Sequence, residues 1–208
     1  MPTDYTIRKI DTQNAEEAAR LLVREFHERE PLAHLNTADP QEFSDYILYL
    51  SNLCAAQGLG FIAKEVNSGR AIGVLLASDL SDSVNASPER NENPIAALID
   101  SLNSTYFNKG ELADNTYLNI KFVATDANIK VKGMVVTLIS ECLQAAKTLG
   151  FQYAQAEATG NISQHIFANK LGFDKKATIK YSEFEVNGNK PFISITGHEG
   201  IQLLIKKL

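Results

Sequence analysis

The sequence "NIKVKGMVV", residues 128–136, decides how this chain is expected to fold. Before it, "TYLNIKFVA" (116–124) alternates in polarity as a strand does. After it, "TLISECLQAAKTLG" (137–150) continues as a helix that ends at a glycine. The apolar residues of this helix fall on one stripe, which predicts a helix of about four turns packed against a core. They are Met134, Val135, Leu138, Ile139, Cys142, Leu143 and Ala146.

The turn between this strand and this helix is basic, and two interpretations of it are open. The first amides of a helix lack intrahelical partners, and the helix dipole adds positive charge there, so an anion such as a diphosphate can bind. Gly133 leaves the backbone uncovered, and Lys130 and Lys132 add charge. The alternative is a helix cap without a ligand. The chain contains no P-loop and no dinucleotide fingerprint, so nucleotide hydrolysis and hydride transfer have no support.

Strands and helices alternate along the rest of the chain. Residues 60–66 and 71–78 form a predicted hairpin, because "NSGR" supplies turn residues between them. The strands at 116–124 and 151–158 are joined by a helix, which implies that they are parallel. Other predicted strands cover 6–10, 175–186 and 200–208, predicted helices cover 12–27, 40–57, 94–108 and 161–171, and a polar surface loop covers 81–93. The fold class is therefore α/β (α+β) with a mixed sheet.

The overall composition is that of an ordinary globular protein. The 208 residues are 44% hydrophobic and carry a formal net charge of −5, which fits one domain and, without a basic run, argues against nucleic-acid binding. The first residues lack a signal-like apolar segment, and no run approaches the roughly 20 apolar residues of a membrane span, so a cytoplasmic protein without membrane contact is expected. Cys54 and Cys142 are expected to be reduced core thiols, and no metal-binding spacing is present.

A second informative segment is "GNISQHIFANKLGF", residues 160–173. It predicts a short helix with Asn161 as the N-cap and Gly172 as the C-terminal stop. Local capping explains both residues. It does not explain why this helix follows one strand after the basic turn.

This order of strand, basic glycine-containing turn, helix, strand and "N…KLGF" resembles the GCN5-related N-acetyltransferase (GNAT) family. In that family the helix begins with Arg or Gln, two residues, Gly, one residue, and Gly or Ala, and its amides bind the pyrophosphate of coenzyme A. The matching residues here are Lys130, Gly133 and Val135, so only the middle glycine is retained. "FIAKEVNSGRAIGVLLAS" (61–78) and "FVATD" (122–126) also resemble family strands.

The resemblance implies a fold and a domain organisation. The fold is a mostly antiparallel twisted sheet with a central parallel strand pair and helices on both faces. Residues 1–208 would form a single N-acetyltransferase domain with a helical or loop insertion near 81–114. "FHEREPL" (26–32) and "GIQLLIKKL" (200–208) are similar to the arylalkylamine or dopamine N-acetyltransferase branch, whose glutamate in this segment is a proposed base.

The implied activity is direct transfer of an acetyl group from acetyl-CoA to a small primary amine, in a monomer or homodimer without a metal. Glu30 matches the proposed base, and the usual acidic tyrosine is replaced by Ala168, so Ser163 or His165 would stand in. A non-catalytic acyl-CoA-binding sensor or degenerate relative is the alternative, which the departures at Val135 and Ala168 favour. The residues implied to bind acetyl-CoA are Phe122, Val123, Ala124, Lys130, Val131, Lys132, Gly133, Met134, Val135 and Asn161.

Overall fold

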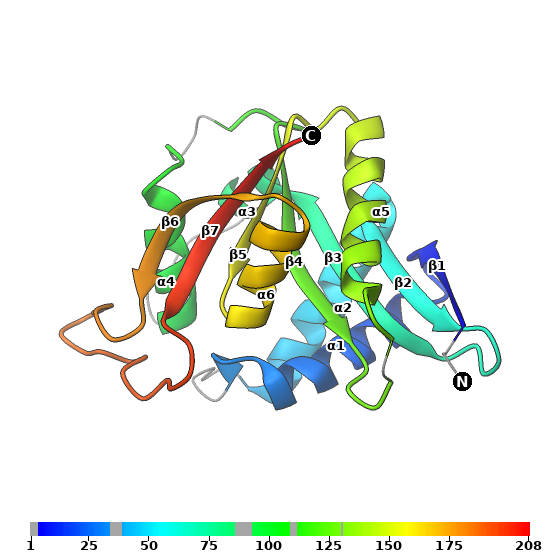
Figure 1. Cartoon of the computed structure of the whole chain (residues 1–208), viewed down its shortest axis with the longest axis horizontal. Coiled ribbons are helices and arrows are strands. Elements are labelled where there is room, and N and C mark those ends of the chain that lie inside the picture. Colours follow the sequence, from blue (N-terminus) through cyan, green and yellow to red (C-terminus); the bar gives the residue numbers. More distant parts are fainter. Residues whose placement is uncertain (1–3, 34–38, 86–92, 109–111, 130) are drawn as a thin grey trace.

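The computed structural model describes residues 4–33, 39–85, 93–108, 112–129 and 131–208, and its seven strands form one sheet (Figure 1). The strands follow the order β1-β2-β3-β4-β5-β7-β6 across the sheet. Only β4 and β5 pair in parallel, and the other neighbours are antiparallel. This confirms the predicted fold class. The strands are β1 Tyr5–Lys9, β2 Gly60–Glu65, β3 Ala71–Asp79, β4 Tyr117–Thr125, β5 Tyr153–Ala158, β6 Asp174–Lys180 and β7 Gly200–Lys207.

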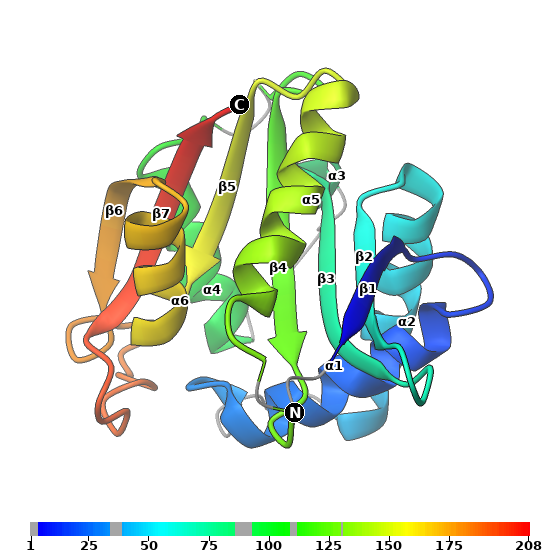
Figure 2. The ribbon, with the colours of Figure 1, turned by 45° about the vertical axis from the view of Figure 1, so that its right-hand side comes forward.

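Helices cover both faces of the sheet, as expected (Figure 2). On one face lie α5 (Met134–Thr148) and α6 (Asn161–His165), which continues as the π-helical turn η2 (Ile166–Lys170). On the other face lie α1 (Ala15–Arg29), α2 (Pro40–Gln57) and α4 (Pro94–Ser104), and the short α3 (Leu80–Asn85) follows β3 directly. A hydrogen bond from the Gln41 backbone N–H to the Asp39 side chain caps α2, which begins at Pro40 as its sequence predicts.

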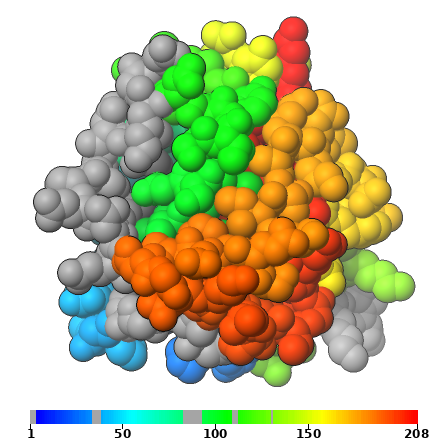
Figure 3. Space-filling model, turned by 90° about the vertical axis from the view of Figure 1, so that its left-hand side faces the viewer, coloured from blue at the N-terminus to red at the C-terminus, as the bar shows by residue number. Residues whose placement is uncertain are grey.

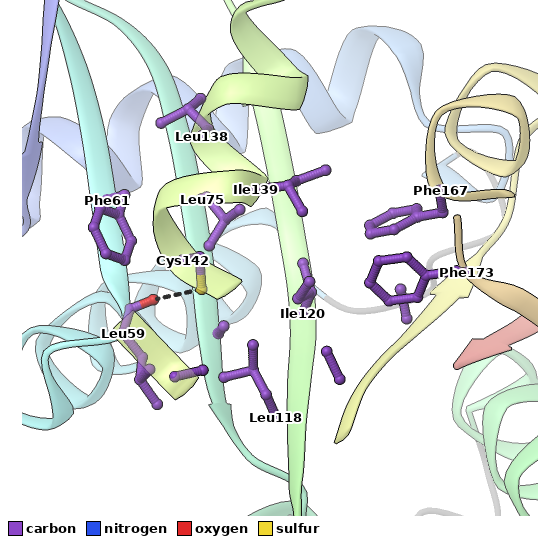
Figure 4. Close-up of a cluster of buried hydrophobic side chains, with 14 of the residues drawn as sticks. Leu59, Phe61, Leu75, Leu118, Ile120, Leu138, Ile139, Cys142, Phe167 and Phe173 are labelled. Atoms are coloured by element: carbon purple, nitrogen blue, oxygen red, sulfur yellow. Dashed lines mark hydrogen bonds between the residues drawn. The ribbon is translucent and has the colours of Figure 1, made fainter. Parts of the chain in front are cut away.

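The face under α5 holds a continuous hydrophobic core (Figure 4). Leu138, Ile139 and Cys142 of α5 lie over β2 to β4, and Phe167 and Phe173 extend the same core to β5. This confirms the apolar stripe predicted for the helix. Every residue of β3 is buried, because helices cover this strand on both sides.

The opposite face has two separate cores. One lies between α1, α2 and strands β2 to β4, and the other lies between α4, strands β6 and β7, and the segment that follows β6. Figure 3 shows that segment (orange) beside α4 (green). The boundary between these two cores falls where β4 and β5 meet.

Strands β4 and β5 diverge soon after they begin. Their pairing comprises Tyr117↔Tyr153, Leu118↔Ala154 and Asn119↔Gln155, whereas β4 stays paired with β3 to Thr125 and β5 with β7 to Ala158. Among the described strands, none therefore bonds to the β5-facing backbone of residues 120–125. We call the diverging segments, residues 120–125 and 156–158, the wedge.

Most predicted elements match the structure to within four residues at each end, and two differ more. The strand expected over 175–186 ends at Lys180, because Tyr181 and Phe184 turn into the core beside α4 and the Phe184 N–H bonds to the Lys180 carbonyl. The loop expected over 81–93 begins as helix α3, and residues 86–92 lie outside the described part of the chain.

Cys54 and Cys142 are buried and free, as predicted for core thiols. Burial raises the pKa of the Cys54 thiol to about 12 and raises that of Cys142 as well, so both remain protonated at neutral pH. None of the helices in the described ranges is long and apolar enough to cross a membrane.

The contact between β6 and β7 predicts that Gly200→Ala is strongly destabilising. A Cβ at Gly200 would lie 2.1 Å from the Ile179 carbonyl oxygen, and backbone cannot move aside as a flexible side chain can. We expect a loss of about 3 kcal/mol or more in the free energy of unfolding, measured by chemical denaturation. Gly69→Ala is the control, because that glycine has a φ of 68° in open space and its replacement costs only about 1–2 kcal/mol of backbone strain. Equal losses would contradict the steric account.

Candidate active site

The start of α5 is not capped by a side chain. Gly133 is the N-cap residue with a φ of 83°, and its carbonyl accepts the Thr137 N–H. The amides of Met134 to Val136 come before this bond and therefore have no helical partners. A Cβ at Gly133 would meet no described atom within 4 Å. The first turn of α5 therefore presents bare backbone N–H groups to an open space, and Lys132 beside it is exposed.

The turn before α5 is anchored on both sides. Ile129 and Val131 pack against the core beneath α5, and the Asp126 N–H donates to the Ile72 carbonyl at 3.0 Å. The Asp126 carboxylate accepts the Asn128 N–H at 2.9 Å. These contacts fix the position of the loop that leads to the uncapped helix. Lys130, the other predicted anion-binding lysine, lies outside the described residues.

Two buried carboxylates join α1 to the end of β4. Glu25 and Asp126 each have side chains that are 1% exposed, and the Arg24 guanidinium lies 2.9 Å from Glu25 and 3.0 Å from Asp126. Arg29 lies 2.6 Å from the second Glu25 oxygen and also donates to the Thr125 carbonyl. Arg70 approaches Asp126 to 3.5 Å.

These contacts keep Asp126 ionised. Burial alone would raise its pKa, but the Asn128 N–H and the charges of Arg24 and Arg70 outweigh burial and hold the pKa below its ordinary value. This network of ion pairs therefore links the last two turns of α1 to the end of β4.

Glu30 comes directly after Arg29 of this network in the sequence and lies at the mouth of the wedge. Its backbone N–H donates to the Phe26 carbonyl and closes α1. Its side chain reaches Thr159, the first residue after β5, and one carboxylate oxygen, Oε1, is buried without a hydrogen-bond partner among the described residues. Glu30 is therefore not an exposed loop carboxylate.

Burial raises the pKa of Glu30, although the Thr159 side chain and the Leu32 backbone partly oppose the rise. The nearby Tyr181 hydroxyl donates to the Thr159 carbonyl at 2.7 Å. Burial raises the pKa of Tyr181 too, and the charge of Glu30 adds to that rise. Tyr181 is therefore a neutral hydrogen-bond donor that holds Thr159 in place beside the carboxylate.

A third segment, at Gly197 and His198, meets the chain just after β5. A Cβ on Gly160 would lie 3.4 Å from a Pro31 side-chain carbon and 3.5 Å from the His198 ring, so a glycine permits the close approach. The Asn161 N–H donates to His198 Nδ1 at 3.2 Å, and the Asn161 side-chain amide donates to the Gly197 carbonyl at 2.7 Å. Asn161 is thus the first residue of α6, and the prediction that it is the N-cap was wrong because Gly160 occupies that position.

Ser163 caps α6 rather than facing the solvent. Its hydroxyl donates to the Gly160 carbonyl at 2.9 Å and accepts the Gly160 N–H at 3.3 Å. His165 is exposed, and Ala168 packs against the core under α5.

The structure places four of the residues predicted from sequence at the wedge. Phe122, Val123 and Ala124 lie on its β4 side, and Glu30 lies at its mouth. Thr159 and Tyr181 were not predicted as neighbours of Glu30, and His198 was not predicted as a neighbour of Gly160 and Asn161. Their sequence positions carry no signal except for "TGHEG" (196–200), because the turn after β6 that brings Tyr181 inward has no recognisable motif. No group of three metal-binding side chains occurs in the described ranges.

The chain matches no family model, but it is similar to several solved structures. Polyamine N-acetyltransferase of Drosophila melanogaster, which forms N-acetylagmatine, gives a TM-score of 0.80 at 18% identity, covering 99% of this chain and 100% of that chain. Arylalkylamine N-acetyltransferase 2 from Aedes aegypti gives 0.79 at 21% identity, covering 98% and 99%. The C-terminal condensation domain of Ebony, in complex with β-alanyl-dopamine, gives 0.81 at 16% identity, covering 99% and 100%. The chain therefore has the GNAT fold, which confirms the resemblance at the level of fold.

The raised pKa of Glu30 predicts a pH-dependent stability difference between the wild type and Glu30→Gln. Because the folded protein disfavours the charged carboxylate, the wild type loses stability relative to the variant as pH rises from about 4.5 through the raised pKa. The loss is about 1.4 kcal/mol for each unit by which the pKa is raised, and it is constant at higher pH. Denaturation of both proteins between pH 4 and pH 9 measures it. Glu185→Gln, at an exposed residue, is the control, and a difference that does not change with pH would refute the assignment.

Proposed function

We propose that the protein is an acetyl-CoA-dependent N-acetyltransferase that moves the acetyl group directly to a small primary amine. The observation that carries this proposal is the arrangement at the wedge. An uncapped helix start and an unpaired strand edge lie on one side of it, and the buried, unpartnered Glu30 oxygen lies at its mouth.

The acyl donor would bind along the wedge. Its diphosphate would accept hydrogen bonds from the amides of residues 133–136, with Lys130, Val131 and Lys132 in the turn before them. The amide-bearing pantetheine arm would pair with the free backbone edge of β4 at Phe122 to Ala124, much as an added strand does. A backbone N–H of the same edge would polarise the thioester oxygen. Asn161 would line the β5 side.

Glu30 would act as the general base. The pKa of an alkyl amine lies well above neutrality, so the attacking nitrogen must lose a proton before or during attack. A carboxylate with a raised pKa accepts that proton more readily than an ordinary one. The nitrogen then bonds to the thioester carbon, the carbon–sulfur bond breaks, and the electron pair leaves with the coenzyme A thiolate.

Ser163 is the candidate for protonating the leaving thiolate. Its hydroxyl is half-buried at the β5 side of the wedge, but its proton is already donated to the Gly160 carbonyl. Transfer would therefore require that hydroxyl to rotate away from the cap. The thiolate of coenzyme A is stable enough to leave unprotonated, so turnover does not depend on this rotation.

A non-catalytic acyl-CoA-binding sensor is the second candidate function. It is favoured by Ala168 at the usual acid position and by the engagement of Ser163 in the helix cap. We place the protein in the cytoplasm, which suits two buried free thiols, as a single domain in a monomer or homodimer.

Gly133→Glu is expected to abolish acetyl-CoA binding, because it puts bulk and negative charge where the diphosphate would lie. In the wild type, acetyl-CoA at ~100 times its dissociation constant adds about 2.7 kcal/mol of stability, which a thermal shift detects. Gly150→Glu is a matched control, since Gly150 has a φ of 91° in open space at the other end of α5. Two results would contradict this proposal: a Gly133→Glu variant that keeps the wild-type thermal shift, or a wild type whose melting temperature does not change at millimolar acetyl-CoA. In either case the turn before α5 would be only a helix cap.

Glu30→Gln is expected to lower kcat for amine acetylation by ~10²–10⁴-fold while leaving the acetyl-CoA thermal shift intact. Thiol release with a panel of primary amines measures turnover. Glu185→Gln serves again as the control. Unchanged turnover in Glu30→Gln would remove Glu30 as the base, and wild-type binding without turnover on any amine would favour the sensor.

A further inference from the structure

Strand β5 carries a row of polar and aromatic side chains on the face opposite α5. Ala154, Ala156 and Ala158 point into the core beneath α5 and α6. Side chains alternate along a strand, so Tyr153, Gln155, Glu157 and Thr159 share the other face. This is the face on which α1 ends, and Thr159 at the end of the row is the residue that contacts Glu30.

A carboxylate organises this row. Glu157 Oε1 accepts hydrogen bonds from the Gln155 side-chain amide at 3.0 Å and from the Asn103 side-chain amide of α4 at 2.9 Å. Because a carboxylate only accepts, both amides must present their NH₂ groups to it. Their carbonyl oxygens then point away from Glu157.

Three side-chain oxygens in or beside this row are buried without partners in the described structure: Asn103 Oδ1, Gln155 Oε1 and Asn119 Oδ1. Gln155 is fully buried, and Asn119, its register partner on β4, is 4% exposed. Ser78, which pairs with Asn119 from β3, donates its hydroxyl to the Asp79 carbonyl instead. We call Asn103, Asn119, Gln155 and Glu157 the acceptor-oxygen cluster.

A buried oxygen without a hydrogen-bond partner destabilises the folded protein, so three of them along this row are expected to have a hydrogen-bond donor. All four groups accept hydrogen bonds and one is negatively charged, which favours a cation with several N–H groups.

The cluster lies at a defined distance from Glu30. Glu157 is two residues from Thr159 on the same strand face, which places them roughly 6–7 Å apart. The stacked rings of Tyr117 and Tyr153, 4.9 Å between centroids, close the row at its other end. A molecule with its reactive amine at Glu30 would therefore bring a second group to Glu157 through a chain of about four carbons.

We propose that the acceptor-oxygen cluster binds the distal cationic group of the acceptor, so that the protein acetylates alkyl diamines or guanidinoalkyl amines in preference to aryl or simple alkyl amines. The inference rests on the proposed function for its catalytic part, but the binding of the distal cation does not. An aryl group at this position would bury the three oxygens against carbon and leave them unpaired. Glu157 supplies the charge, and the three amide oxygens accept the remaining N–H groups.

The test compares 1,4-diaminobutane with n-butylamine, which has the same chain but no second ammonium. We expect kcat/KM for the diamine to exceed that for the monoamine by about 10- to 100-fold, the usual effect of a charged hydrogen bond. Calorimetry on the complex of the protein with coenzyme A should show that the diamine binds more tightly than the monoamine. Phenethylamine, which carries an aryl group and no second ammonium, tests whether the protein prefers aryl amines.

Glu157→Gln keeps the shape of the side chain and removes its charge. It should reduce the preference for the diamine to near parity while leaving the acetyl-CoA thermal shift unchanged. Glu141→Gln, at an exposed residue of α5, makes the same change of charge and should keep the preference.

Equal use and equal binding of the diamine and monoamine by the wild type, or a preference for phenethylamine, would overturn the inference while the proposed function stands. So would a Glu157→Gln variant that keeps the full preference, in which case the cluster holds only water. Tighter binding of the diamine that depends on Glu157, without acetylation of any amine, would support the inference and remove the proposed function. If Glu157→Gln does not fold, the wild-type comparison decides alone.

Discussion

The early divergence of β4 from β5 is the constraint on which the rest of the structure depends. Three residue pairs hold the two strands together, and beyond Asn119 each strand stays with its outer neighbour. The face opposite α5 is consequently divided into two cores, one under α1 and α2 and one beside α4. A continuous sheet would have satisfied the backbone of residues 120–125 internally. Here that edge remains available to a ligand that can pair with it.

A divided sheet needs contacts that fix each half, and the network of Glu25 and Asp126 with three arginines fixes the β4 half against α1. It joins α1 to the end of β4, and Glu30 follows at once, where the chain crosses from one core to the other and Leu32 enters the second. The arginines are about half exposed, so solvent screens their charges and the network contributes more to geometry than to stability. The position of Glu30 thus depends on the same contacts that fix the turn before α5.

Sequence patterns predicted the elements that depend on local periodicity and turn chemistry. The bounds of α2 were predicted to the residue, and the parallel pair followed from the helix between its strands. The strand after 174 was predicted too long, because "YSEFEV" alternates like a strand while Tyr181 and Phe184 are drawn into a core that only tertiary structure creates. The neighbours of Glu30 could not be predicted for the same reason. Thr159 and Tyr181 come from segments that meet only when β5 and β6 are assembled, and the sequence near 81–114 gave no sign that Asn103 would reach Glu157.

The buried and half-buried carboxylates divide into two classes by how well they are compensated. Glu25 and Asp126 have arginines and backbone amides as partners, as buried charges require when they serve the fold. Glu30 has no cationic partner among the described residues and keeps one buried oxygen unbonded, while Glu157 is surrounded by amides whose own oxygens are unsatisfied. A fold optimised for stability would have paired or removed these groups. Their place in one row, from the mouth of the wedge along β5, is the basis of our proposal that the missing donors belong to a ligand with an amine at each end.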